Sequence, residues 1–123
     1  MSEVRTVSAT GGAKGVKPAR FELLPTDSLW ELAEHYGKGA EKYVSADTGL
    51  DNWRLGYEWS KSFGAALRHL VAALGGEDVD PDSGSKHVIA VAWHMLAIAH
   101  WMNEPGYRQF DDRQARLELD SPL

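Results

Sequence analysis

The fold is decided by one stretch of sequence, residues 85–103, which reads SKHVIAVAWHMLAIAHWMN. Apolar side chains recur at helical spacing along it and cover more than half of the circumference of the helix that this spacing predicts. These apolar positions are Val88, Ile89, Val91, Ala92, Met95, Leu96, Ile98, Ala99 and Met102. A helix that is apolar almost all round is central in its domain or is buried between subunits. We therefore expect other helices, or a second copy of the chain, to pack around residues 85–103.

Two further helices are predicted upstream, over residues 27–43 and 57–74. Thr26 or Asp27 is the expected N-cap of the first. Residues 45–56 between the two helices are rich in turn-forming residues, so they predict a loop with Trp53 as its anchor. The core stripe expected on the second helix consists of Phe63, Leu67, Leu70 and Leu74.

The fold class that these segments indicate is all-α, a small bundle of three to four main helices completed by oligomerisation. Residues 1–20 combine glycines with lysines and arginines, so we expect a flexible basic N-terminal arm there. Residues 21–104 form the expected helical domain. Residues 105–123 are mixed and charged, and they predict a charged C-terminal tail or a short helix.

Composition restricts the possible functions. The chain has 123 residues, a length that suits one domain. Its formal net charge of −5 argues against binding to duplex nucleic acid. It contains no cysteine, so any metal must be held by oxygen and imidazole ligands. The most apolar stretch, residues 88–101, is too short to span a bilayer. We therefore expect a cytoplasmic protein without a membrane partner.

The connector at residues 76–84 carries four carboxylates within six residues: Glu77, Asp78, Asp80 and Asp82. Such a cluster repels itself unless a cation or basic groups neutralise it. The spacing of the aspartates is similar to the start of an EF-hand loop, but the glycine falls one place late and the twelfth position is Ile89. EF-hand calcium binding is therefore excluded. The alternative to a metal site is a solvated turn in which an aspartate or serine caps the next helix.

His69 precedes this connector and His87 follows it. If the helices on both sides form an antiparallel hairpin, the two imidazoles can face the connector's carboxylates. This would make a site for Mg²⁺, Mn²⁺ or a similar divalent metal, or a site in which a histidine activates water. The alternative is that each histidine is a hydrogen-bonded packing residue. His94 lies on the same helix face as His87, whereas His100 points elsewhere.

Basic and aromatic residues could bind a nucleotide beside this site. Arg68, Lys38 and Lys42 are candidate phosphate contacts, and Tyr43 and Trp53 could stack on a base. The alternatives are ordinary surface charge for the lysines and a core position for Trp53. The sequence contains no phosphate-binding Gly-x-x-x-x-Gly-Lys-Ser/Thr loop and no adjacent His-Asp pair, so those hydrolase classes are disfavoured.

Several separated motifs, in order, resemble a phage-associated family, the dATP/dGTP diphosphohydrolase N-terminal domain. The resemblance covers about residues 11–103. Its motifs are Leu23-Leu24-Pro25, Gly39-Ala40-Glu41-Lys42-Tyr43, Asp51-Asn52-Trp53-Arg54, Arg68-His69-Leu70, Gly76-Glu77-Asp78-Val79-Asp80-Pro81-Asp82-Ser83-Gly84 and His87. Asp82 stands where the family pattern leads us to expect glutamate, and residues 44–49 look like an insertion.

The resemblance implies a phage or prophage protein of the host cytoplasm. It would cleave dATP or dGTP to the monophosphate and pyrophosphate with Mg²⁺ or Mn²⁺, an activity associated with MazG-like nucleotide pyrophosphohydrolases. The catalytic residues expected are His69, Glu77 and Asp78. The metal ligands expected are Glu77, Asp78, Asp80, Asp82 and His87. The substrate contacts expected are Lys38, Lys42, Tyr43, Asn52, Trp53 and Arg68.

Two other functions stay open at this point. In the first, the motif residues bind or sequester a nucleotide without hydrolysing it. In the second, the chain is a structural or interaction protein without a ligand, and the apolar circumference of residues 85–103 is an oligomer interface.

Overall fold

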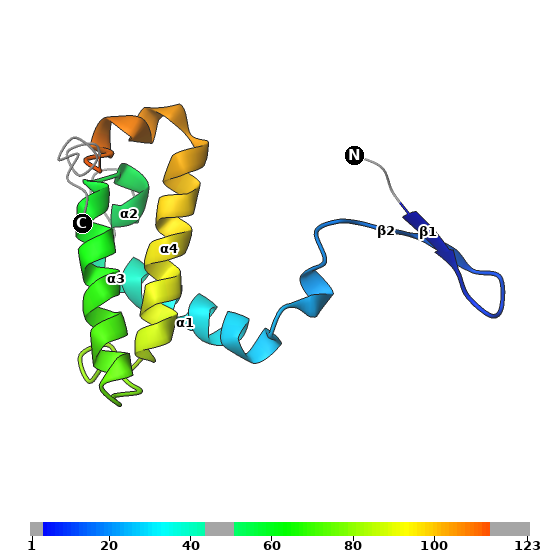
Figure 1. The fold of residues 1–123 in the computed structure, drawn as a ribbon, viewed down its shortest axis with the longest axis horizontal. Helices are drawn as coiled ribbons and strands as arrows, with labels where there is room; N and C mark the ends of the chain where they lie inside the picture. The colour runs from blue at the N-terminus through cyan, green and yellow to red at the C-terminus, as the bar shows by residue number, and fades with distance from the viewer. Residues whose placement is uncertain (1–3, 44–50, 114–123) are drawn as a thin grey trace, which may run out of the picture.

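The computed structural model describes residues 4–43 and 51–113 and is mostly helical (Figure 1). Its elements, in chain order, are β1 (Val4–Val7), β2 (Ala13–Val16), the 3-10 helix η1 (Phe21–Leu23), α1 (Thr26–Tyr43), α2 (Asn52–Leu55), α3 (Trp59–Leu74), α4 (His87–Asn103) and the 3-10 helix η2 (Pro105–Phe110). Within these described ranges, no helix is long and apolar enough to cross a bilayer.

The three long helices lie close to the ranges that the sequence predicts. α3 and α4 run side by side in opposite directions and are joined by the connector, and α1 packs across α4 (Figure 1). The loop expected around Trp53 contains the short helix α2, and Trp53 itself is buried. The expected anchor is therefore a part of the core.

The N-terminal segment departs from the all-α prediction. β1 and β2 form an antiparallel hairpin in which Val4 pairs with Val16 and Val7 with Ala13. Gly11 has a φ of 92° in the turn, where a residue with a Cβ atom would be strained. Glycine and lysine are depleted in strands, which is why the composition of residues 1–20 did not predict this hairpin. It lies apart from the helical bundle (Figure 1).

The core is aromatic rather than leucine-rich. Its buried cluster consists of Trp53, Trp59, Ala97, Ile98 and Trp101. The half-buried side chains packed against it are Tyr36, Tyr57, Phe63, Trp93, Tyr107 and Phe110. Large ring systems from α2, α3, α4 and η2 therefore meet at one end of the α3–α4 pair.

The core stripe predicted on α3 is wrong for three of its four positions. Leu67 is 60% exposed, Leu70 is 45% exposed and Leu74 is 92% exposed. The buried face of α3 instead carries Trp59, Ser62 and Ala66. Small residues at positions 62 and 66 let α4 approach closely, and this turns the leucines to the outside. Completion of the bundle by a second copy, which would cover such residues, stays a prediction.

Gly56 joins α2 to α3 and is the position where we expect the most sensitive glycine. Its φ is 85°, and an added Cβ would lie 2.6 Å from the Phe110 ring. Gly56→Ala should therefore lower the free energy of unfolding by roughly 2–5 kcal/mol, from backbone strain and overpacking together. Urea denaturation measures this loss. Gly106→Ala is the matched control, because a Cβ there meets nothing within 4 Å. Equal midpoints for the two variants would contradict the prediction.

Candidate functional site

The connector between α3 and α4 is a hydrogen-bonded loop with a fixed shape. Val79 and Lys86 form an antiparallel bridge, in which the Asp80 amide donates to the Ser85 carbonyl at 2.8 Å. The His87 amide donates to the Asp78 carbonyl at 3.0 Å, and the Gly84 amide donates to the Asp80 carbonyl at 2.8 Å. These bonds set the direction in which each acidic side chain points.

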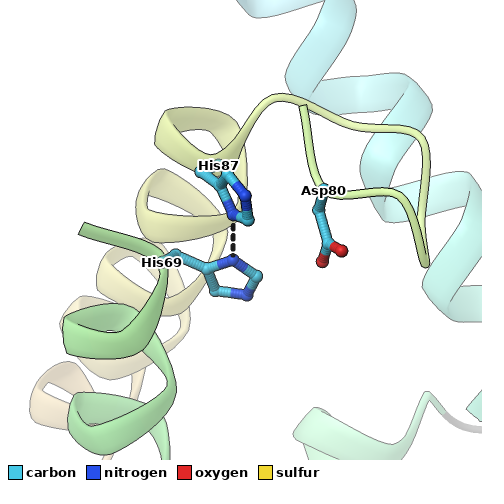
Figure 2. Close-up of side chains that lie close together, drawn as sticks. All are labelled: His69, Asp80 and His87. Carbon is cyan, nitrogen blue, oxygen red and sulfur yellow. Dashed lines mark hydrogen bonds between the residues drawn. The ribbon is translucent and has the colours of Figure 1, made fainter. Parts of the chain in front are cut away.

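One carboxylate of the connector meets both histidines. His69 from α3, Asp80 from the connector and His87 from the first residue of α4 each offer one ligand atom, and these atoms lie within 4.8 Å of one another. Figure 2 shows the Asp80 side chain beside the two imidazole rings. We call these three residues the His–Asp cluster. Among the residues that the structure describes, this cluster has the arrangement of histidine and carboxylate side chains that could hold a metal ion.

The two imidazoles of the cluster contact each other through their Nδ1 atoms, which are 2.9 Å apart (Figure 2). His87 also contacts Glu77, with 2.6 Å between Nε2 and Oε1. Because a carboxylate accepts, the Nε2 atom of His87 carries the proton, and in the neutral ring Nδ1 keeps its lone pair. As a hydrogen bond, the contact between the histidines therefore requires the Nδ1–H of His69 to donate.

The same arrangement fits a metal ion. Nitrogen ligands bind a transition-metal ion at about 2.0–2.1 Å, so two of them at a right angle lie about 2.9 Å apart. A histidine ligand commonly donates its other ring N–H to a carboxylate, which fixes the tautomer. The Glu77 carboxylate is placed to accept from the Nε2–H of His87 in this way. The donor set of the cluster, two imidazoles and one carboxylate, therefore fits a divalent cation.

Burial favours the uncharged form of three imidazole rings in and around this site. It lowers the pKa of His69 even though Asp80 acts in the opposite direction. It also lowers the pKa of His35, where Lys38 adds to the effect, and it lowers the pKa of His94 to about 4. Neutral imidazoles at pH 7 are able to bind a metal or to accept a proton.

A cavity of about 470 Å³ opens beside the cluster. Its polar wall lies at the connector and α1, and its aromatic wall is formed by Tyr36, Trp53 and Trp93. Tyr57 also lines the cavity. The complete lining is His35, Tyr36, Lys38, Gly39, Ala40, Lys42, Asp51, Asn52, Trp53, Tyr57, His69, Asp80, Asp82, Ser83, Trp93 and His94. This volume is within the range of cavities that hold a small organic ligand.

Hydrogen bonds fasten α1 to the connector across the polar wall. The Lys38 ammonium donates to the Ser83 carbonyl and to the Ser85 hydroxyl, both at 3.0 Å. The His35 Nδ1 atom lies 2.8 Å from the same Ser85 hydroxyl. Ser85 is buried, so its hydroxyl depends on these partners. A lysine is therefore held in place beside the His–Asp cluster.

The substrate contacts predicted from the sequence are partly assembled. Lys38, Lys42, Asn52 and Trp53 line the cavity. Arg68 is exposed on α3 and is not among the lining residues. The side chain of Tyr43 lies outside the described part of the chain.

The structure also brings together some of the predicted metal and catalytic residues and leaves others apart. His69, Asp80 and His87 come together, and Glu77 contacts His87 from behind. Asp82 lines the cavity, and its amide donates to the Asp80 carboxylate at 2.9 Å. The exposed side chain of Asp78 belongs neither to the cluster nor to the lining.

Sequence reasoning missed several residues of the cavity. His35 lies three residues before Lys38 on α1, and this helical spacing could have pointed to it. Tyr36 also lines the cavity, but its spacing from Lys38 does not predict this. The sequence around Trp93 and Tyr57 did not indicate a cavity, because an aromatic residue in or near an apolar helix is normally predicted to lie in the core. The sequence around Ser62, which contacts two lining residues, did not indicate one either.

The fold and the cavity define a small, mostly helical domain with a cavity between its helices. The family model described as dATP/dGTP diphosphohydrolase, N-terminal, matches residues 8–113. The chain therefore belongs to this family, as its motifs predicted. No curated protein and no solved structure gives a significant match.

Proposed function

We propose that this chain is a metal-dependent nucleotide phosphohydrolase that cleaves dATP or dGTP to the monophosphate and pyrophosphate. The observation that carries the proposal is the position of the His–Asp cluster at the wall of a cavity that also holds lysines and aromatic rings. The name of the family supports the substrate class and the reaction.

In this proposal the metal is held by His69, Asp80 and His87, and Glu77 orients His87. A divalent cation supplies charge neutralisation at the phosphates and a more acidic water. Two imidazole ligands favour Mn²⁺ or another transition-metal ion over Mg²⁺, which prefers oxygen ligands. Of the two metals expected from the sequence, Mn²⁺ is therefore the better fit.

The phosphates and the base would occupy the two walls of the cavity. Lys38 is fixed beside the connector by Ser83 and Ser85 and would bind the phosphates, with Lys42 farther along α1. The base would lie beside Tyr36, Trp53 and Trp93, which line the cavity and pack against one another at Tyr36. The amide of Asn52 in the same lining can donate to a base and accept from it.

The proposal is tested by incubating the purified protein with dATP or dGTP and either Mn²⁺ or Mg²⁺. We expect deoxynucleoside monophosphate and pyrophosphate in equal amounts, with faster turnover in Mn²⁺. Titration calorimetry with the same nucleotides is run in parallel. Nucleotide that binds tightly and is recovered intact would replace hydrolysis by sequestration. Neither product nor binding would contradict both.

A further inference from the structure

A chain of three hydrogen-bonded side chains lies in the wall of the cavity and is not used by the function proposed above. The hydroxyls of Tyr57 and Ser62 are 2.6 Å apart. The Ser62 hydroxyl is also 3.0 Å from the Nδ1 atom of His94. The three residues come from the segment before α3, from α3 and from α4.

The two ends of this chain face the cavity, while its middle is closed to solvent. Tyr57 and His94 both line the cavity. Ser62 is 0% exposed, so its hydroxyl has to satisfy its hydrogen bonds with these two partners. A buried serine that joins two lining residues makes a continuous path for a proton from one point of the cavity to another.

The proton count allows two arrangements of this path. In the first, His94 Nδ1–H donates to Ser62, Ser62 donates to Tyr57, and His94 Nε2 keeps its lone pair. In the second, Tyr57 donates to Ser62, Ser62 donates to His94 Nδ1, and His94 Nε2 carries a proton. The two arrangements differ only in the positions of shared protons.

We propose that Tyr57, Ser62 and His94 form a proton relay that connects the attacking water with the leaving group, an inference that rests on the function proposed above. Water gives a proton to His94 Nε2, and its oxygen forms the new bond to phosphorus. His94 Nδ1–H passes to Ser62, the Ser62 proton passes to Tyr57, and the Tyr57 proton passes to the pyrophosphate oxygen. That oxygen leaves with the electron pair of the broken P–O bond.

The electrostatic surroundings support a relay whose members stay neutral. Ser62 is fully buried and His94 is half-buried, so a charge on either side chain would be poorly solvated. Burial also raises the pKa of Tyr57, so its hydroxyl keeps a proton to donate. The transfer begins and ends with neutral side chains. It therefore avoids placing an isolated charge in the interior.

Two variants interrupt the relay at different points. Ser62→Ala removes its middle and Tyr57→Phe removes the group that faces the leaving oxygen. For each we expect kcat to fall roughly 10- to 100-fold, the size of a lost general acid–base contribution, while KM changes less than about 2-fold. The wild type should also turn over more slowly in D₂O than in H₂O, and this isotope effect should shrink in both variants.

Matched controls separate the relay from a loss of folding. Ser60 lies on the same helix as Ser62, and Ser60→Ala removes a hydroxyl that donates to the Asp112 carboxylate beyond η2. Tyr107→Phe removes a phenol that donates to the Arg54 carbonyl. Neither residue lines the cavity of the proposed site. Both controls should keep the wild-type kcat. Nitrogen-15 NMR of the nucleotide-free protein should show that the tautomer balance of His94 changes in Ser62→Ala and stays unchanged in Ser60→Ala.

The outcomes distinguish the relay from the proposed function. An active wild type with equally active Ser62→Ala and Tyr57→Phe variants would overturn the relay and leave the function standing. A wild type that forms no monophosphate would overturn the function and the relay with it. A kcat loss shared equally by Ser60→Ala and Tyr107→Phe would show a structural effect and would also overturn the relay.

Discussion

Asp80→Ala is expected to abolish binding of Mn²⁺ and to reduce hydrolysis by about 100-fold or more. The Asp80 carboxylate is the one anionic member of the His–Asp cluster. Without it, the cluster would offer the cation two imidazole rings and no anionic ligand. Removal of a metal from a hydrolytic site removes both its charge and its activated water. Calorimetric titration with Mn²⁺ and a product assay measure the two effects separately.

Asp78→Ala is the control for this prediction. It deletes the same chemical group from the same connector, and the side chain of Asp78 is exposed and lies outside the cluster. We expect near wild-type metal affinity for this variant. Equal losses in the two variants would favour the broader ligand set that the sequence predicts. An Asp80→Ala protein that binds Mn²⁺ as tightly as the wild type would rule out the cluster as the metal site.

The sequence predicted the convergence of His69 and His87 because two helices joined by a short connector must be antiparallel. It could not choose among the four carboxylates of the connector, since all have similar chemistry and lie within six residues. That choice depends on the bridge between Val79 and Lys86 and on the turn that ends at Gly84. These are loop hydrogen bonds, which residue type and spacing do not specify.

The main helices were also predictable, but the side of α3 that packs inward was not. Leucine spacing placed Leu67, Leu70 and Leu74 in the core, yet these side chains are exposed. The face of α3 that packs inward is decided instead by Trp59 and Trp101, whose rings stack with centroids 6.4 Å apart. Each of these rings carries more apolar surface than a leucine side chain. A periodic pattern identifies an apolar face but does not rank it against large rings elsewhere.

Trp101→Ala is expected to cause the largest loss of stability, about 3–5 kcal/mol. The indole of Trp101 is 0% exposed and lies among the rings of Tyr57, Trp59 and Tyr107. Its removal leaves a cavity in the middle of the core, and a loss of this size is a large part of the stability of a small domain. Urea denaturation measures it. Trp30→Ala makes the same chemical change at a side chain that is 73% exposed, and it should cost less than about 1 kcal/mol.

Trp101→Phe tests how this core supports the site. The Nε1–H of Trp101 donates to the Trp53 carbonyl at 3.0 Å, and phenylalanine keeps a ring but loses this bond. Trp53 belongs to the aromatic wall, whereas the His–Asp cluster lies at the other end of the α3–α4 pair. We therefore expect weaker nucleotide binding with unchanged Mn²⁺ affinity in the folded variant. Equal losses of nucleotide and Mn²⁺ affinity would contradict this expectation. They would show that the hydrogen bond from Trp101 supports the His–Asp cluster as well as the aromatic wall.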